Sequence, residues 1–372
     1  MGDSQITGTH TKRVIASSSA ILQYGGQAVI EGVMMRSPKF FAVACRRPNG
    51  EVVTQREDVD KSIIGKLKWL NWPFARGTLA LIDAMVLGIK ALAFAGNVQV
   101  EAEAAASQTA AAAPNGQQTV SGAGEKKHRG EIPAMPASGR INDVIIGSTV
   151  VASLLFGLGL FVLLPTTITG LVTRFHLVNI AHGHAAMQLN VADGLIRMVI
   201  FLIYILLISR MENIRRVFQY HGAEHKAINT LEAGLTLNLE NATKASRIHP
   251  RCGTSFIFVV LITNVIVFAF LPRPSFLPFR FLEHLAVIPL VAGIAYEVTK
   301  IAGKYRHIPL VMGLLAPGMA TQLLTTREPD NSQVEVALAA LLSVLEAEGH
   351  IADDTDVSQD VPDALEPAVA IA

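Results

Sequence analysis

The sequence predicts a mainly α, polytopic membrane protein with about four transmembrane helices and a small N-terminal cytoplasmic α+β region that contains a β-hairpin. Three observations lead to this fold class. The 372 residues are 51% hydrophobic and only 16% charged, and their mean hydropathy is +0.40, which is more apolar than a typical water-soluble protein. Several uncharged runs approach the ~20 residues that a helix needs to cross a bilayer. Two short apolar segments flank a turn sequence near the N-terminus.

The predicted crossings follow from the apolar runs. The run 144–164 is unbroken and uncharged, so we expect it to cross the membrane. We expect further crossings at 191–209 and 254–271. Two later apolar segments, 285–296 and 308–324, are flanked by charges or interrupted by proline. We expect one of them to cross fully and the other to be re-entrant, with its backbone covered by protein.

Basic residues predict the orientation. The His-rich loop 210–252 holds seven Arg and Lys side chains, whereas the loop before it holds only Arg174 up to the start of the second crossing. The positive-inside rule therefore makes loop 210–252 cytoplasmic. Both termini fall on the same side, so we expect a multi-pass protein of the cell (inner) membrane whose partner is the lipid bilayer. The net charge of +1 and the lack of a basic stripe exclude nucleic acid as an expected partner, and the sequence points to no protein partner.

Residues 20–96 form the predicted cytoplasmic α+β region. Strands are expected at 41–46 and 51–55, because the sequence Arg-Pro-Asn-Gly between them is typical of a tight turn. The apolar segment 77–96 contains Asp83 and Lys90, and a charge in mid-bilayer is costly. We therefore expect a core or interfacial helix there rather than a crossing.

The remaining domain boundaries follow from composition. Segment 97–140 is rich in Ala, Gly, Ser, Pro and Gln and is expected to be a disordered linker. The multi-pass membrane domain is expected at 141–327, followed by an acidic, largely disordered tail at 328–372. Cys45 and Cys252 are the only cysteines, so a disulfide framework is excluded and a reduced, cytosol-facing setting is the simpler interpretation.

The segment His221-Gly-Ala-Glu224-His225 carries the strongest chemical signal. Apolar residues around it recur at helical spacing and Gly234 offers a stop, so we expect an amphipathic helix. Residues four apart share one helix face, so His221 and His225 can present two imidazoles to one ion, for which zinc is the natural candidate. Glu224 then occupies the position of the general base in an H-x-x-E-H motif.

Other residues of the same loop can complete the ligand set. His249 and Cys252 lie close together before the third crossing, so His221, His225, His249 and Cys252 are the predicted zinc ligands. All four together would form a closed, structural site. Catalysis needs an open position, so the enzyme interpretation prefers His221 and His225 with one ligand chosen from His249, Cys252, Glu232 and Glu297.

A purely structural interpretation stays open at this point. The two histidines can be satisfied by hydrogen bonds, Glu224 can pair with a nearby cation, and Cys252 can be a small buried hydrophobe. The glycine-flanked segment 25–36 lacks the spacing of a phosphate-binding loop, so no nucleotide is inferred. Glu31 and Arg36 of this segment can face the metal site or pair with each other. His176, His182 and His184 fall in the predicted outer loop, where solvated histidines are the default.

Four motifs, in order along the chain, carry a family resemblance: GGQAVIEGVMMRSP (25–38), YHGAEHK (220–226), HPRCGTSF (249–256) and PGMATQLLTTREPD (317–330). The chain resembles the YqhQ-like bacterial membrane proteins, domain of unknown function 1385, which are described as predicted metal-dependent enzymes. The resemblance runs from about residue 25 to about residue 340. It implies a multi-pass membrane protein whose histidine-rich loop is the active region, and it implies no substrate.

The leading functional hypothesis is a zinc-dependent hydrolase that acts on a peptide or lipid-linked bond at the cytoplasmic membrane surface, with Glu224 as the catalytic residue. The alternative is a non-enzymatic membrane scaffold or assembly factor with a structural metal site. A transporter is the third hypothesis, because Asp193, Arg197, Glu283 and Glu297 can line a path, although few charges fall inside the predicted crossings.

Overall fold

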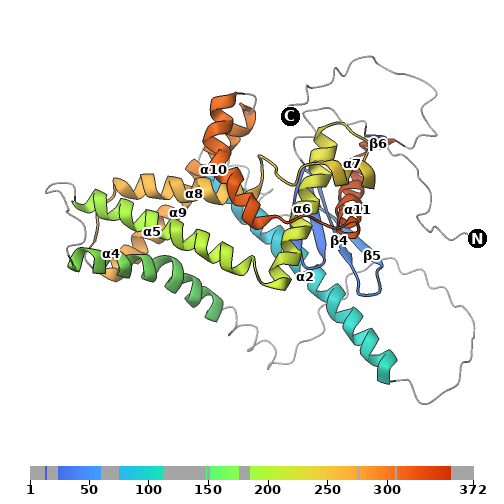
Figure 1. Ribbon diagram of the computed structural model, residues 1–372, viewed down its shortest axis with the longest axis horizontal. Coiled ribbons are helices and arrows are strands. Elements are labelled where there is room, and N and C mark those ends of the chain that lie inside the picture. Colours follow the sequence, from blue (N-terminus) through green and yellow to red (C-terminus); the bar gives the residue numbers. More distant parts are fainter. Residues whose placement is uncertain are drawn as a thin grey trace, which may run out of the picture.

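The computed structural model describes residues 13–14, 24–59, 75–111, 148, 151–175, 185–274, 276–305 and 308–352. Two parts lie next to each other along the longest axis (Figure 1). One is a group of long apolar helices that run roughly side by side. The other is a small antiparallel sheet covered by helices. The predicted fold class is confirmed: the chain is mostly helical, with membrane-length apolar helices and an N-terminal sheet.

The sheet is a meander of four strands, each paired with the next in sequence: β2 (Gly25–Val29), β3 (Gly32–Arg36), β4 (Phe40–Arg46) and β5 (Val52–Asp58). The predicted hairpin corresponds to β4 and β5, whose pairing begins with Arg46 opposite Val52. Gly50 in its turn has a φ of +90°, a value that glycine adopts without steric cost. A separate short pair is formed by β1 (Arg13–Val14) and β6 (Ile351–Ala352).

The hairpin of β2 and β3 was not expected from the sequence. Its two-residue turn is Ile30-Glu31, and Glu31 takes a φ of +52°, which is uncommon for a residue other than glycine or asparagine. The turn therefore lacks the glycine, asparagine or proline signal that marked the other hairpin. Arg216 holds Glu31 through both carboxylate oxygens, and Tyr220 donates a further hydrogen bond of 3.3 Å.

Both faces of the sheet are covered. On one face lie α6 (Glu212–Glu232) and α11 (Asn331–Ala347), and on the other lies α2 (Ala75–Ala111). The side chains of β3 and β4 alternate between the two cores. Val33, Met35, Ala42 and Ala44 face α6 and α11, whereas Met34, Phe41, Val43 and Cys45 face α2. This double coverage explains why both strands read as continuous apolar runs.

Two regions differ from the domain prediction. The tail 328–372 is not disordered throughout, because residues 331–347 form α11, whose apolar face is fully buried against the sheet and α6. The first part of the expected linker 97–140 is helical, because α2 continues to Ala111. Residues 112–140 and 353–372 lie outside the described part of the chain.

The helical part contains α4 (Leu164–Arg174), α5 (Ala185–Ile208), α8 (Gly253–Ala269), α9 (Leu277–Lys304) and α10 (Pro309–Thr325), and a π-helical turn, η4 (Gly159–Leu163), precedes α4. Within the described residues, four helical segments are long and apolar enough to cross a membrane by length and composition: Arg76–Ala102, Val151–Arg174, Ala185–Ile208 and Pro278–Ala302.

The predicted and observed segments do not coincide everywhere. The first expected crossing, 144–164, overlaps the helical segment Val151–Arg174, and nearly all of 144–150 lies outside the described residues. The third, 254–271, is the 17-residue α8, which is apolar but shorter than the four. The segment 77–96 lies in the helix Arg76–Ala102, which is apolar enough to cross a membrane despite Asp83 and Lys90. Part of that helix also packs on the sheet, through residues such as Leu87 and Ala91.

Candidate metal centre

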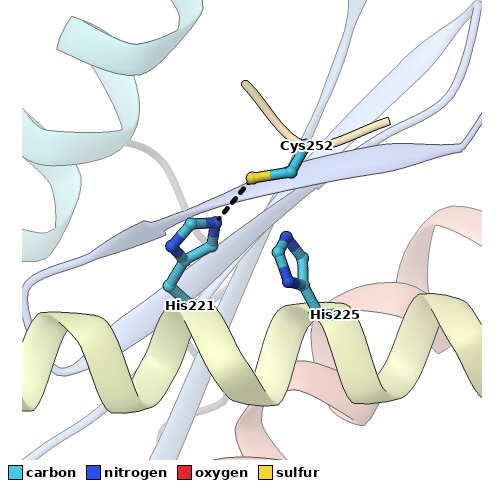
Figure 2. A group of neighbouring side chains, drawn as sticks. All are labelled: His221, His225 and Cys252. Atoms are coloured by element: carbon cyan, nitrogen blue, oxygen red, sulfur yellow. Dashed lines mark hydrogen bonds between the residues drawn. The ribbon is translucent and has the colours of Figure 1, made fainter. Parts of the chain in front are cut away.

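Helix α6 carries the H-x-x-E-H segment, as the apolar periodicity predicted. The helix ends at Glu232, and Gly234 follows with a φ of +67°, which is the usual way for a glycine to end a helix. His221 and His225 lie one turn apart on the same face, with ring centroids 4.4 Å from each other. Both rings project from α6 toward the segment that precedes α8, as Figure 2 shows.

Cys252 completes a group of three donors. Its Sγ lies 3.2 Å from Nε2 of His221, and the ligand atoms of His221, His225 and Cys252 all lie within 4.8 Å of one another. Cys252 is the N-cap residue of α8 and accepts a hydrogen bond from the Thr254 amide. The cysteine is therefore fixed by the start of α8, while both histidines are fixed by α6 (Figure 2).

The outer nitrogens of both histidines are held by backbone carbonyls. Nδ1 of His221 lies 2.8 Å from the Thr325 carbonyl, and Nδ1 of His225 lies 2.6 Å from the Arg247 carbonyl. A ring whose Nδ1–H donates to a carbonyl presents a bare Nε2, which is the tautomer that binds a metal. This second layer of contacts is typical of metal-binding histidines.

His249 does not join this group. Its ring centroid is 5.7 Å from that of His225, but its Nε2 lies 3.1 Å from a carboxylate oxygen of Glu232. Arg251 also bonds this oxygen of Glu232. The backbone of His249 is bracketed by the buried amide of Gln322, which accepts from its N–H at 2.9 Å and donates to its carbonyl at 2.8 Å. The structure thus places His249 beside the three donors, paired with Glu232.

Two other residues that the sequence associated with the site, Glu297 and Arg36, also have partners elsewhere. Glu297, on α9, forms a two-point ion pair with Arg76 at the start of α2. Arg36 bonds Asp83 at 2.5 Å, so it pairs neither with Glu31 nor with the metal ligands. The outer-loop histidines, His176, His182 and His184, lie outside the described residues.

Glu224 is buried next to the three donors. One of its carboxylate oxygens is 3.5 Å from Nε2 of His225, and its side chain rests on the backbone of Gly26 in β2. Burial raises the pKa of Glu224, and nearby His221, His249 and Arg251 and the Gly26 amide oppose that rise. A carboxylate with a raised pKa is a stronger base than one exposed to solvent, which suits the role of a general base.

These groups line one pocket of about 100 Å³. We refer to it as the His–Cys pocket; its lining residues are Tyr24, Gly25, Gly26, His221, Glu224, His225, Ile228, His249, Arg251, Cys252 and Gly253. All five predicted site residues belong to it. The contribution of Gly25 and Gly26 to this pocket was not predicted from the sequence. Their distance of about 200 positions from α6 in the sequence hides the contact, and only the shared family motif around them singles them out.

Comparison with known proteins places the chain in a family. A family described as a protein of unknown function (DUF1385) matches residues 72–347. The chain belongs to the DUF1385 family. It is 35% identical over 329 residues to the uncharacterized protein YqhQ of Bacillus subtilis (strain 168), a match that covers 87% of this chain and 93% of that protein. No solved structure shows a significant match. The DUF1385 match includes α6, the segment before α8 and α11, and the YqhQ match is broader.

Proposed function

We propose that this DUF1385 protein binds a zinc ion through His221, His225 and Cys252 and acts as a metal-dependent hydrolase at the membrane surface. The observation that carries the proposal is the convergence of three donor atoms within 4.8 Å, two of them on rings whose other nitrogens are held by carbonyls. Ligands of a tetrahedral zinc ion lie roughly 3.5 Å apart, given zinc–nitrogen and zinc–sulfur bonds of about 2.0–2.3 Å.

The donor set favours a catalytic over a closed site. Three protein ligands leave one position of a tetrahedral ion for water or substrate, whereas a fourth ligand would close it. His249 is the candidate for a fourth ligand, but its Nε2 is paired with Glu232. A zinc ion in this place supplies a Lewis acid for a carbonyl or phosphoryl group. Glu224, buried 3.5 Å from His225, then accepts the proton of the attacking water.

The position of the pocket favours a substrate at the bilayer surface. Cys252 directly precedes α8, and the Thr325 carbonyl that holds His221 belongs to the last residue of α10, so the donors lie where two apolar helices end. A membrane-anchored peptide or a lipid-linked molecule can present a bond to this place while its anchor stays in the bilayer. The substrate class of the proposal is therefore a membrane-tethered peptide, ester or phosphoester.

The metal half of the proposal is tested by elemental analysis of protein purified without added chelator. We expect about one zinc per chain in the wild type and a loss of most of it in His221→Ala, His225→Ala and Cys252→Ala. His249→Ala is the matched control, since it removes an imidazole from the same pocket without removing a proposed ligand. Wild-type protein without bound metal contradicts the proposal, and loss of zinc in His249→Ala would indicate a closed four-ligand site instead.

The catalytic half is tested by Glu224→Gln. This change keeps the size of the side chain and removes its ability to accept a proton. We expect zinc content and melting temperature close to those of the wild type and a loss of at least 100-fold in the hydrolysis of chromogenic ester, phosphodiester and peptide probes. Loss of metal and of folding together would favour the scaffold with a structural metal.

The short Cys252–His221 contact favours a second candidate, a metal-independent thiol hydrolase. A cysteine and a histidine within hydrogen-bond reach, with the histidine oriented by a third group, is the arrangement of a covalent nucleophile and its base. Here the Thr325 carbonyl is the orienting group. Activity that survives chelation but is lost in Cys252→Ser supports this candidate, and activity that is lost on chelation and returns with zinc supports the first.

A further inference from the structure

A cluster of buried and half-buried polar side chains lies among α4, α5, α8 and α9, at the end of these helices that is remote from the His–Cys pocket. We call it the arginine cluster; its members are Asn190, Asp193, Arg197, Arg273, Arg280 and His284. The pocket follows the C-terminal end of α5 and precedes α8, whereas the cluster uses the N-terminal part of α5, the end of α8 and the start of α9. About 15 residues of α5, roughly 22 Å of helix, separate Asp193 from the end of α5.

A single carboxylate at the centre of the cluster serves two guanidinium groups. Arg197 and Arg280 each lie 3.2 Å from Asp193, one on each of its oxygens, and Thr169 donates to it at the same distance. Arg197 also contacts Asn264 at 3.1 Å and His284 at 3.3 Å. Asp193, Arg197 and Arg280 are all at least nine-tenths buried.

The third arginine, Arg273, bonds a neutral group. Arg273 donates to the Asn190 carbonyl oxygen at 2.9 Å. The Asn190 amide nitrogen donates to the carbonyls of Phe268 and Leu271 at 2.9 and 3.0 Å, so the side chain is locked with its oxygen toward Arg273. This network holds the guanidinium in place without neutralising it.

The cluster carries more positive than negative charge. Among the described residues of the cluster, three guanidinium groups face one carboxylate, Asp193, and even with Glu283, which lies near Arg280, one positive charge remains in excess. In addition, the Nε of Arg197 is buried without a hydrogen-bond partner. An uncompensated charge and an unsatisfied donor are costly in a region of low dielectric constant. A bound anion would offset the excess positive charge.

The surroundings indicate which anion. Phe270, Phe276 and Phe279, at the ends of α8 and α9, are exposed, and such side chains at the ends of membrane helices face lipid rather than water. At one end of membrane-length helices, the cluster is positioned to meet the glycerophosphate groups of lipids. Guanidinium groups form paired hydrogen bonds with phosphate oxygens. We propose that Arg273 and Arg280, with Arg197 behind them, bind a phosphate group at the membrane interface, independently of the His–Cys pocket.

The test measures lipid binding to delipidated protein in detergent by native mass spectrometry. The probes are phosphatidylglycerol and diacylglycerol with the same acyl chains, which lacks the phosphate. We expect phosphatidylglycerol to bind more tightly, and Arg273→Gln to weaken its binding at least about tenfold, the effect of one charge-assisted hydrogen bond. Arg174→Gln is the matched control, because Arg174 is an exposed arginine at the same end of the bundle.

A second arm identifies the source of the phosphate. If millimolar inorganic phosphate displaces phosphatidylglycerol, the site takes the free anion; if it does not, the site is specific for the lipid headgroup. Equal binding of phosphatidylglycerol by wild type and Arg273→Gln overturns the proposal, and so does equal binding of the two lipids by the wild type.

A further variant guards against a folding defect. If Arg273→Gln does not fold, as judged by its melting temperature without lipid, Arg273→Lys replaces it. Lysine keeps the charge and can still bond Asn190, but it lacks the two-pronged geometry. We expect weaker phosphatidylglycerol binding in Arg273→Lys than in Arg174→Lys, and equal binding in these two variants overturns the proposal.

Discussion

Gly26 has no side chain, and this leaves room for the side chain of Glu224 in the His–Cys pocket. A Cβ atom at this position would come within 2.5 Å of the Met34 carbonyl oxygen and within 2.9 Å of Cγ of Glu224. The neighbouring Gly25 also lines the pocket, but a Cβ there would meet nothing within 4 Å. The two glycines therefore share a motif and differ in physical role.

This difference gives a paired prediction. We expect Gly26→Ala to cost about 1–3 kcal/mol, because the strand or the Glu224 side chain must move to avoid the clash. Gly25→Ala is expected to stay within about 0.5 kcal/mol of the wild type. Melting temperatures of the two variants in the same detergent provide the measurement. Equal melting temperatures would mean that Glu224 does not rest on β2.

Cys45 offers a prediction from its surroundings. The side chain is fully buried in the core between the sheet and α2. Burial first, and then the negative charge of Glu31, raise its pKa to about 12. At pH 8 only about one such thiol in ten thousand is ionised, and the thiolate is the reactive form.

We therefore expect Cys45 to resist alkylation by iodoacetamide at pH 8 in the folded protein and to react fully after denaturation. Intact-mass measurement on Cys252→Ser isolates this thiol. One adduct on the folded variant within minutes would show that the sheet opens or that the core around Cys45 is looser than described.

At the scale of elements, α11 shows why an acidic composition misled the prediction of the tail. The segment after 328 has many carboxylates, but Val334, Leu338, Leu341 and Leu345 recur at helical spacing within it and are buried. The helix starts with a capping box: Asp330 accepts from the Gln333 amide at 2.9 Å, and Gln333 accepts from the Asp330 amide at 3.0 Å. A capping residue and an apolar stripe are local signals that an average over 45 residues conceals.

Asp330→Ala is expected to lower the free energy of unfolding by about 1 kcal/mol, and Asp330→Asn by less, since asparagine also caps helices well.

The contribution of the Asp330 charge to stability depends on pH. Burial raises the pKa of Asp330, but hydrogen bonds from Ser332 and Gln333 outweigh it, so the pKa is lower than its ordinary value of 3.8. The contribution of the charge is therefore present above pH 4 and lost as pH falls through the lowered pKa. The measurement is the difference in melting temperature between wild type and Asp330→Asn at pH 7 and at pH 3. The same difference at both pH values contradicts the predicted pH dependence.

The candidate site could be predicted only as far as local periodicity reaches. The positions of His221, Glu224 and His225 follow from a helix, and the structure has that helix. The choice among His249, Cys252, Glu232 and Glu297 depends on which way each side chain turns. His249 and Glu232 bond each other, and Glu297 bonds Arg76 on a distant helix. No spacing in the sequence encodes such pairs, because they join segments that only the tertiary fold brings together.

At the scale of the whole molecule, α2 connects the two parts of the structure. Its first turns pack on α9, where Gly77 leaves no room for a side chain beside Tyr296. Its later turns cover the sheet through residues such as Leu87 and Ala95. Ion pairs reinforce both contacts: Arg76 with Glu297 and Arg36 with Asp83. The sequence predicted only a core or interfacial helix here. The structure gives this helix both a membrane-length apolar stretch and a place in the core of the sheet domain.

This arrangement leads to a prediction about sidedness. The His–Cys pocket and the sheet lie at one end of the membrane helices, and the arginine cluster lies at the other. The basic residues of loop 210–252 predict that the pocket faces the cytoplasm.

Leu235, in the turn after α6, and Phe175, at the end of α4, are both exposed and mark the two ends. Because Cys45 and Cys252 are buried, an introduced cysteine dominates labelling by a membrane-impermeant maleimide. We expect Phe175→Cys to be labelled in intact cells and Leu235→Cys only after lysis. The reverse pattern would place the pocket, and the thiol of Cys252 with it, outside the cytoplasm. That outcome would contradict a metal site that depends on a reduced cysteine.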